Sequence, residues 1–291
     1  MIKDISAQLL PMMPPFRPTV GASPHMVFDR VRNKFYRDLI RKEVKGKVCA
    51  ESGFGTGLLV LYALRYGAKH VYAYEIDPTM FEIGKKILEE MGADFSRVTL
   101  IQGAYKDEHD DVEILIQERV DRALWGEQII NTYPTRAKII PGLLGCKIKS
   151  RPGHLIPERI KKLKNQWLNK TIRRRDVRGK FKRVMRQMIR SNEYTSYDSL
   201  VRAELFDEPV YEDTILGSYS IDLNKGCPDN FITVPIVIDN PDTLIWCDYS
   251  MNDWSITENP TCWKPDKVVV KHRPGKVTFV QDTRNGAWWL E

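Results

Sequence analysis

A glycine-rich loop constrains this chain more than any other feature. Residues 49–59 read Cys-Ala-Glu-Ser-Gly-Phe-Gly-Thr-Gly-Leu-Leu, between a short apolar run and a helical stretch. Glycines at these positions let a backbone turn tightly and approach a ligand closely, although glycines also make ordinary turns. The spacing G-x-G-x-G differs from the dinucleotide spacing G-x-G-x-x-G. Glu75 closes the next apolar run, where an acid can bind both hydroxyls of a ribose. The loop and the acid together predict a nucleoside ligand.

The segments around this loop alternate between strand-like and helical patterns, which is typical of a parallel, doubly wound α/β sheet. An apolar stripe at helical spacing predicts a helix over 25–44. The other predicted helices cover 57–66 and 79–91, and the predicted strands cover 48–50, 71–76, 98–102, 122–125 and 154–156.

The pattern becomes β-rich from about residue 209. Asn285-Gly286 is a hairpin signal between the last two predicted strands. The predicted strands of this part cover 219–223, 231–238, 243–249, 267–270, 276–280 and 287–290. We expect four segments: a proline-rich arm (1–24), an α/β domain (25–157), a basic helical insert (158–205) and an antiparallel β domain (206–291).

The charge is unevenly distributed. The formal net charge is +7, but residues 159–190 hold 14 basic residues and one acid, so the rest of the chain is acidic. An amphipathic helix pair with a solvated basic face is one interpretation of this insert. Docking to an acidic protein surface or to nucleic-acid phosphates is another, and an altered mode of assembly is a third. The net charge of +13 favours a partner.

Other features limit the class of protein. The five cysteines are odd in number and show no metal-type pairing, so we expect reduced thiols and no metal site. No apolar run approaches the roughly 18 residues that span a bilayer. The first residues lack the order of a signal peptide. We therefore expect a cytoplasmic protein with no membrane partner.

Residues 26–36 read Met-Val-Phe-Asp-Arg-Val-Arg-Asn-Lys-Phe-Tyr. With the glycine loop, this segment resembles the class I S-adenosylmethionine methyltransferases and, more narrowly, the protein arginine methyltransferases. The resemblance implies that Arg32 pairs with the cofactor carboxylate. The alternative for this residue is a solvated helix charge. The complete set of cofactor residues that the resemblance implies is Arg32, Glu51, Gly53, Gly55, Gly57, Glu75, Ala104 and Tyr105.

The resemblance covers roughly residues 20–157 and 210–291. The strand at 98–103 is similar to the family's strand beside the adenine pocket. His154-Leu155-Ile156-Pro157 is similar to the sequence that closes the cofactor domain, and 259–264 to the family's Thr-His-Trp loop. The implied fold is a Rossmann-like domain followed by a β-barrel-like domain, with S-adenosylmethionine as cofactor. Met26 and Trp263 are implied to assist catalysis.

The family orients the substrate guanidinium with two glutamates of one loop, about nine residues apart. We assign Glu127 as the first of them, which puts the second near Arg136, a basic residue. Glu127 is then either a catalytic clamp whose partner comes from elsewhere, or a residue at a strand end without a catalytic role.

Three functions are therefore in competition. The first is methyl transfer to a protein guanidinium, in an enzyme that we expect to be oligomeric. The second is a catalytically weak or inactive fold of the same kind, used as an adaptor subunit of a larger assembly such as a virus particle. The third is methylation of a nucleic acid, for which the Asn/Asp-Pro-Pro-aromatic motif is missing from the sequence.

Overall fold

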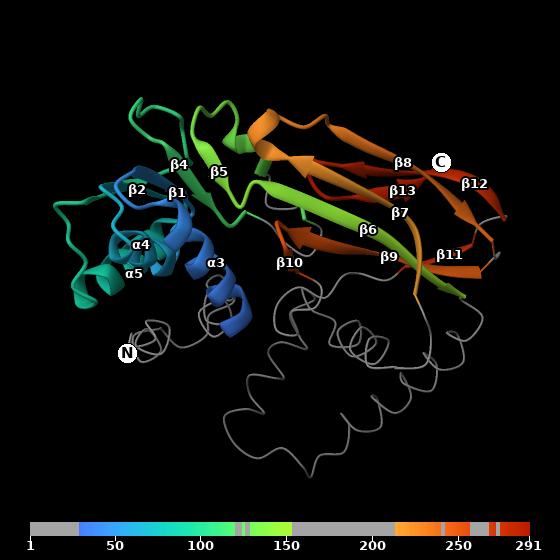
Figure 1. Cartoon of the computed structure of the whole chain (residues 1–291), viewed down its shortest axis with the longest axis horizontal. Helices are drawn as coiled ribbons and strands as arrows, with labels where there is room; N and C mark the ends of the chain where they lie inside the picture. Colours follow the sequence, from blue (N-terminus) through green and yellow to red (C-terminus); the bar gives the residue numbers. More distant parts are fainter. Residues whose placement is uncertain are drawn as a thin grey trace, which may run out of the picture.

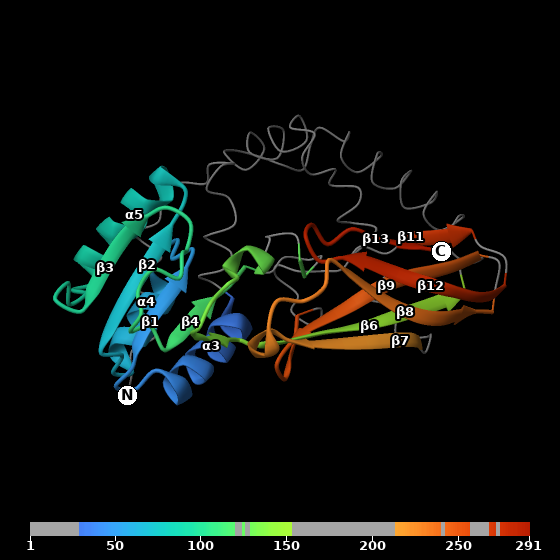
Figure 2. The ribbon, with the colours of Figure 1, turned by 90° about the horizontal axis from the view of Figure 1, so that it is seen from above.

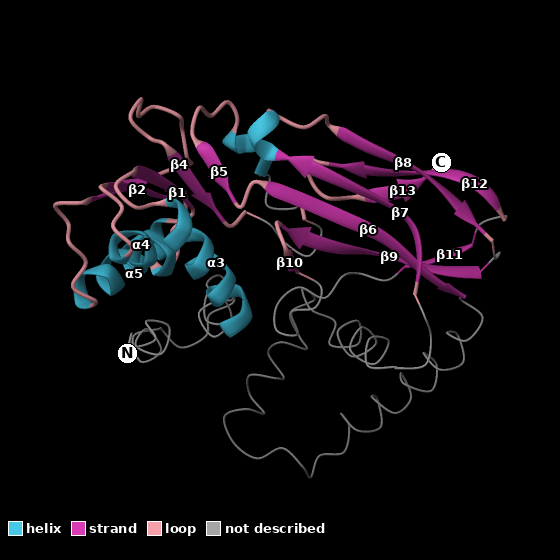
Figure 3. Ribbon diagram, in the orientation of Figure 1, coloured by secondary structure: helices cyan, strands magenta, loops and turns pink. Residues whose placement is uncertain are grey.

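The computed structural model describes residues 29–119, 124–125, 129–152, 213–239, 242–256, 268–271 and 274–291. The proline-rich arm, the basic insert, the predicted strand at 154–156 and the predicted domain boundary at 157 lie outside these residues. The described residues form two halves, one with helices and a parallel sheet, the other built from antiparallel strands (Figures 1 and 3).

The first half is the predicted doubly wound sheet. Its five strands are parallel and follow the order β3-β2-β1-β4-β5. Strands β2 and β3 lie on one side of β1, and strands β4 and β5 lie on the other side. The elements are α3 (Arg30–Glu43), β1 (Val48–Ser52), α4 (Leu58–Arg65), β2 (His70–Glu75), α5 (Pro78–Glu90), β3 (Val98–Gln102), β4 (Ile114–Gln117) and β5 (Lys138–Ile140).

Aspartate caps fix where two of the helices begin. The Asp29 carboxylate accepts hydrogen bonds from the backbone N–H groups of Val31 and Arg32, so α3 begins at Arg30 within the predicted span. Asp77 caps α5 in the same way and is followed by Pro78 in the first turn. Both caps bring the start of a helix to the edge of the sheet.

The position of the fourth strand corrects the sequence-based prediction. We expected a strand over 122–125, whereas β4 lies at 114–117, where Ile-Leu-Ile-Gln is completely buried. Leu124 and Trp125 lie in a bend, and Leu124 has a positive φ of 68°. A strand buried on both faces needs an unbroken apolar run, and 114–116 provides it.

The second half contains two antiparallel sheets. Buried and exposed residues alternate along β8, as expected for a strand with one face in the core. One sheet has the order β10-β9-β6-β7 with β11 beside β9, and the other has the order β13-β12-β8. These strands are β6 (Leu143–Pro152), β7 (Thr214–Asp222), β8 (Phe231–Ile238), β9 (Asp242–Met251), β10 (Trp254–Ser255), β11 (Val268–Lys271), β12 (Gly275–Asp282) and β13 (Trp288–Leu290).

Two details of this half concern the prediction. The Asn285-Gly286 hairpin is confirmed, since β12 and β13 pair antiparallel across it. The ten-residue strand β6 lies in the segment that we assigned to the first domain, yet it pairs with β7 and β9 of the antiparallel sheet. The antiparallel part therefore begins directly after β5.

The two halves share one hydrophobic core. The hydroxyl of Tyr36 in α3 donates to the carbonyl of Gln117 and lies 3.8 Å from the sulfur of Met251 in β9. The ring of Phe35 lies 5.0 Å from that of Trp254. Helix α3 thus packs between the parallel sheet and the antiparallel strands (Figure 2). Within the described part of the chain, no helix is long and apolar enough to cross a membrane.

Candidate active site

The glycine loop leaves β1 at the point where the strand order reverses, which is where ligands bind in open α/β sheets. Gly53, Gly55 and Gly57 have φ angles of 82°, 50° and 76°, which favour glycine. A Cβ atom on Gly53 or Gly55 would meet nothing within 4 Å. The loop therefore presents open backbone to any ligand at this edge of the sheet.

Glu75 holds the loop in place. Its Oε2 accepts a hydrogen bond of 2.9 Å from the Gly55 N–H, and its Oε1 accepts one of 3.0 Å from the Asp77 N–H. A carboxylate has about four acceptor sites, so each oxygen can still accept a ribose hydroxyl. Glu75 is thus at the predicted place, at the end of β2, and also connects two loops of the site.

A buried ion pair lies beside the loop. Arg32 of α3 donates to Glu118 through Nε and Nη2, each at 2.5 Å from a carboxylate oxygen, and the two side chains are only 4% and 9% exposed. Burial lowers the pKa of Arg32, but the facing Glu118 carboxylate outweighs burial, and the net shift is upward. This geometry excludes the alternative that Arg32 is a solvated helix charge.

Glu118 is the site residue that the sequence analysis missed. It directly follows β4, and because Gln117 pairs with Ser52 of β1, Glu118 lies next to the glycine loop. Glu118 and Glu127 are nine residues apart, which is the spacing sought for two glutamates on one loop. Glu118 is therefore a candidate partner for Glu127, on its N-terminal side.

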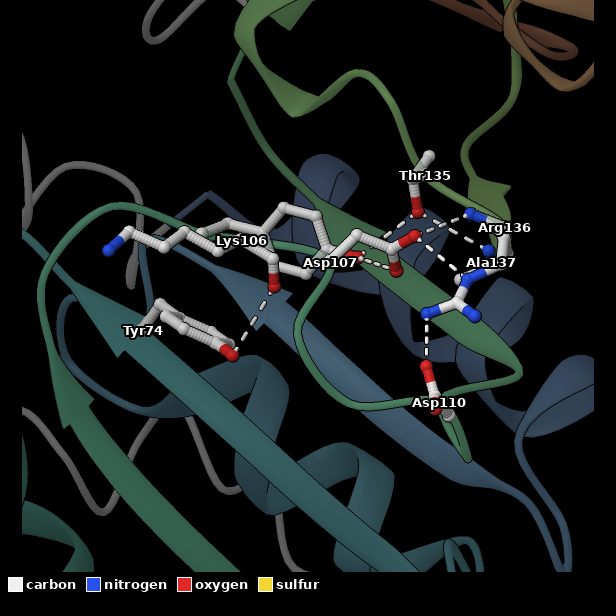
Figure 4. Close-up of polar contacts among 8 residues, drawn as sticks. Tyr74, Lys106, Asp107, Asp110, Thr135, Arg136 and Ala137 are labelled. Atoms are coloured by element: carbon white, nitrogen blue, oxygen red, sulfur yellow. Dashed lines mark hydrogen bonds and ion pairs between the residues drawn. The ribbon is translucent and has the colours of Figure 1, made fainter.

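Arg136 does not face this site. Its guanidinium binds Asp107 at 3.2 Å and Asp110 at 2.5 Å, and its side chain is 62% exposed. Figure 4 shows the three side chains together at the loop between β3 and β4. This arginine belongs to a surface ion-pair cluster with two aspartates, and the pairing of Glu127 with a second carboxylate stays a prediction.

Glu51 lies in β1 with 2% of its surface exposed, and its Oε2 has no hydrogen-bond partner among the described residues. Burial raises the pKa of this carboxyl well above its usual range; the Arg32 charge opposes the rise, while Glu118 and Glu75 add to it. An unsatisfied buried carboxyl is costly and is expected to gain a partner from a ligand. A cationic or hydrogen-bond-donating group would fit here.

The charges of the site select the kind of ligand. The Glu51 carboxyl feels the charges of three groups, the Arg32 guanidinium and the carboxylates of Glu118 and Glu75, so three acids and one cation lie in this part of the molecule. Such an excess of acid repels the pyrophosphate of a dinucleotide and attracts a cation. Among the described residues, no group of three or more His, Cys, Asp or Glu side chains is arranged to hold a metal ion. A nucleoside that carries positive charge matches the arrangement.

The remaining predicted residues are placed as follows. Ala104 is exposed two residues after the end of β3, and its place near a base stays a prediction. The Tyr105 side chain is 7% exposed, packs edge-on against Tyr74, and its hydroxyl bonds with Asp107 and Thr135. A contact of Tyr105 with the base stays a prediction. The predicted catalytic residues Met26, Glu127 and Trp263 lie outside the described residues.

Gly84 of α5 packs directly against Phe54 and Gly55 of the glycine loop. We predict that Gly84→Ala lowers the stability of the fold and weakens ligand binding. The new Cβ atom would overlap the Gly55 carbonyl oxygen and lie 2.5 Å from the Phe54 ring. Overpacking of this kind costs about 1–3 kcal/mol, and relief requires the loop to move. Denaturant unfolding measures the loss. Lys85→Ala, at an exposed position of the same helix, is the control; an unchanged midpoint for Gly84→Ala would contradict the packing.

The fold defines the class: an open parallel sheet with a glycine loop at its switch point, followed by antiparallel sheets, has the architecture of a class I methyltransferase. Sequence comparison narrows the class. The chain is 33% identical over 118 residues to protein arginine N-methyltransferase 8-B of Danio rerio, covering 38% of this chain and 28% of that protein. It is 34% identical over 119 residues to protein arginine N-methyltransferase 1 of Saccharomyces cerevisiae, covering 38% and 33%. The matches thus span about a third of these relatives, and no family model matches.

Solved structures cover nearly the whole chain. The crystal structure of PRMT6 superposes with a TM-score of 0.58 at 18% identity, over 93% of this chain and 98% of that one. The Trypanosoma brucei PRMT1 enzyme–prozyme heterotetrameric complex with AdoHcy gives 0.57 at 19% identity, over 90% and 87%. The chain therefore has the protein arginine methyltransferase fold, and the resemblance inferred from its motifs is confirmed.

Proposed function

We propose that this chain is an S-adenosylmethionine-dependent methyltransferase that acts on the guanidinium of a protein arginine. The observation that carries the proposal is the buried Arg32–Glu118 pair at the carboxyl edge of the sheet. It places a fixed cation and a fixed anion side by side, next to a backbone loop with open space above it. Such a pair suits a cofactor that ends in a carboxylate and a substrate that carries a guanidinium.

The residues present fit the cofactor. Arg32 would hold its carboxylate, Glu51 its ammonium group and Glu75 its ribose hydroxyls, while Gly53 and Gly55 allow close approach of the backbone. When bound, S-adenosylmethionine supplies a methyl group activated by an adjacent sulfonium. The acidic surroundings favour this cationic group over its neutral thioether product, which helps the product to leave.

The chain's own residues then act on the substrate. Guanidinium is always protonated in water and is a weak nucleophile, so it must be oriented. Both Glu118 oxygens accept a hydrogen bond from Arg32, and each oxygen has a second acceptor site that can bind a nitrogen of the substrate guanidinium. Holding the charge on two nitrogens would leave the third aligned with the methyl carbon, so that its bond to this carbon forms as the carbon–sulfur bond breaks, and the nitrogen gives up its proton to a site carboxylate or to water. Glu127, nine residues further along, is proposed as the second carboxylate.

A calorimetric titration of the full chain with S-adenosylmethionine tests the proposed function. We expect saturable binding of one cofactor per chain at concentrations below millimolar. Absence of binding up to millimolar cofactor would sink the proposal and revive the inactive adaptor as the better interpretation. The matches to named methyltransferases do not favour that alternative.

Glu51 gives the proposal a pH signature. Because its pKa is raised in the folded state, the folded chain binds more protons than the unfolded chain above the ordinary value of 4.5, and stability is lost as the pH rises through this window. We predict that Glu51→Gln is more stable than the wild type at pH 8. At pH 5 this difference in stability between variant and wild type should be smaller. The same variant should bind S-adenosylmethionine about tenfold more weakly, because the ammonium loses a charged acceptor. Thermal unfolding at both pH values, with Glu82→Gln as the exposed control, checks the first effect; identical pH profiles of Glu51→Gln and wild type would refute it.

The partners are proposed more coarsely. We propose a protein substrate and an oligomeric enzyme, supported by the heterotetrameric Trypanosoma brucei neighbour. Docking of residues 159–190 to an acidic protein surface or to nucleic acid stays a prediction from charge alone, as does the cytoplasmic location.

A further inference from the structure

A chain of buried hydrogen bonds joins the loop that follows Glu118 to the antiparallel half. The indole N–H of Trp125 donates to the Tyr219 hydroxyl at 3.1 Å, and that hydroxyl donates to Oε1 of Gln281 at 2.6 Å. Nε2 of Gln281 donates to the Tyr249 hydroxyl at 2.8 Å and to the Gly286 carbonyl at 3.1 Å. The Gln281 Oε1 atom accepts one hydrogen bond and its Nε2 atom donates two, so the orientation of this amide is fixed.

This network connects elements that are distant in the sequence. Tyr219 lies in β7 and Tyr249 in β9 of one antiparallel sheet, whereas Gln281 lies in β12 of the other. Trp125 comes from the parallel half, beyond β4. Trp125 and Gln281 are fully buried, Tyr249 is 3% exposed and Tyr219 is half-buried. Water is therefore excluded from the bonds that the Gln281 amide donates, and the two bonds of the Tyr219 hydroxyl are partly buried.

The loop is forced into an unfavourable conformation where it joins the network. Leu124, directly before Trp125, is fully buried and has a φ of 68°, a region that bulky side chains rarely adopt. Such strain persists only where the surrounding structure determines it, and it is common at functional sites. The surrounding structure here is the pocket in which the Trp125 indole is bound.

The loop is therefore anchored from both halves. At its start, Glu118 is held by Arg32 of α3. Seven residues later, Trp125 is held by Tyr219 of β7, and Glu127 follows two residues after that in the sequence. The distance between the two anchors depends on how the antiparallel sheets pack against the parallel one.

We infer that Tyr219 and Gln281 are positioning residues for methyl transfer: acting through Trp125, they fix Leu124 and Trp125 relative to Glu118. This inference rests on the proposed function for its catalytic consequence. Neither residue touches the cofactor-binding loop, so their effect should appear in the turnover of the bound substrate and not in cofactor binding.

Tyr219→Phe tests the inference, with Tyr249→Phe as a matched control. Each variant removes one buried hydroxyl from the same network, but only Tyr219 contacts Trp125. Without the Tyr249 hydroxyl, the Gln281 amide keeps its bond to Gly286 and its acceptor role toward Tyr219. We expect Tyr219→Phe to lower kcat about tenfold on an arginine-containing peptide, with the cofactor Kd unchanged within twofold. Tyr249→Phe should retain kcat within twofold.

A spectroscopic measurement keeps the inference separate from the proposed function. The indole N–H resonance of Trp125, assigned with Trp125→Phe, should shift and exchange at least tenfold faster in Tyr219→Phe and stay in place in Tyr249→Phe. An unmoved resonance in Tyr219→Phe, or an equal loss of kcat in both variants, overturns the positioning role. If the wild type bound no cofactor and transferred no methyl group while the resonance still responded, the proposed function would fail and the anchoring of the loop would stand.

Discussion

We expect Glu118→Gln to abolish most methyl transfer and to leave cofactor binding intact. The amide keeps the shape of the side chain but loses the charge that orients a guanidinium. A charge-assisted hydrogen bond contributes about 1.5–3 kcal/mol, and removal of a group aligned with the charge of the transition state costs roughly 100-fold in kcat. Arg32 remains free to bind the cofactor carboxylate, so the cofactor Kd should change by less than threefold.

The same substitution should destabilise the free protein. Removal of one partner from a buried pair leaves an uncompensated charge and costs about 3–5 kcal/mol. Addition of S-adenosylmethionine should raise the stability of Glu118→Gln and of the wild type by the same amount, because the cofactor Kd is nearly the same in both. Thermal unfolding with and without cofactor measures both effects, and Glu90→Gln at an exposed position is the control. Transfer rates within threefold of wild type would show that Glu118 does not hold the substrate.

Arg32→Ala has the opposite signature, since it removes the cofactor's anchor. The Glu118 carboxylate loses the guanidinium that it binds, and the nearby Glu51 carboxyl loses the cation that favours its charged form. We expect the cofactor Kd to rise at least tenfold and the protein to lose stability. Arg37→Ala, on the same helix with a half-exposed side chain, provides the control in a calorimetric titration. Wild-type affinity in Arg32→Ala would place the cofactor elsewhere.

A double variant separates stability from binding. Replacement of both members of a buried ion pair by neutral side chains often restores stability. Arg32→Met combined with Glu118→Gln should therefore unfold at a higher denaturant concentration than either single variant. Its affinity for the cofactor should stay low, because the guanidinium proposed to bind the cofactor carboxylate is absent. Recovered binding in the double variant would contradict the role of Arg32.

The sequence predicted the parallel half well because its signals are local. The glycine loop, the apolar runs of β1 to β3 and the acid at the end of β2 each occupy a few consecutive residues, and the structure places them as expected. Arg32 was found only through the resemblance, since a lone arginine on a helix is more often a surface charge. The ion pair that buries it spans 86 residues, and no local pattern indicates that contact.

Glu118 was missed for a related reason. With a strand placed at 122–125, Glu127 took the position at a strand end, and the search for its partner ran toward Arg136. With the buried strand at 114–117, Glu118 is the residue that follows the strand end, and the candidate second glutamate is then found before Glu127 and not after it. The network from Trp125 to Gln281 was equally beyond prediction, because its members come from four segments joined only by tertiary packing.

Methyl transfer to a defined peptide tests the central claim most directly. The full chain is incubated with methyl-labelled S-adenosylmethionine and an arginine-rich peptide, beside the same peptide with every arginine replaced by lysine. The two-glutamate site predicts label on the arginine peptide, none on the lysine peptide, and a loss of roughly 100-fold in Glu118→Gln. Cofactor binding without transfer to arginine, or equal transfer to both peptides, would contradict it.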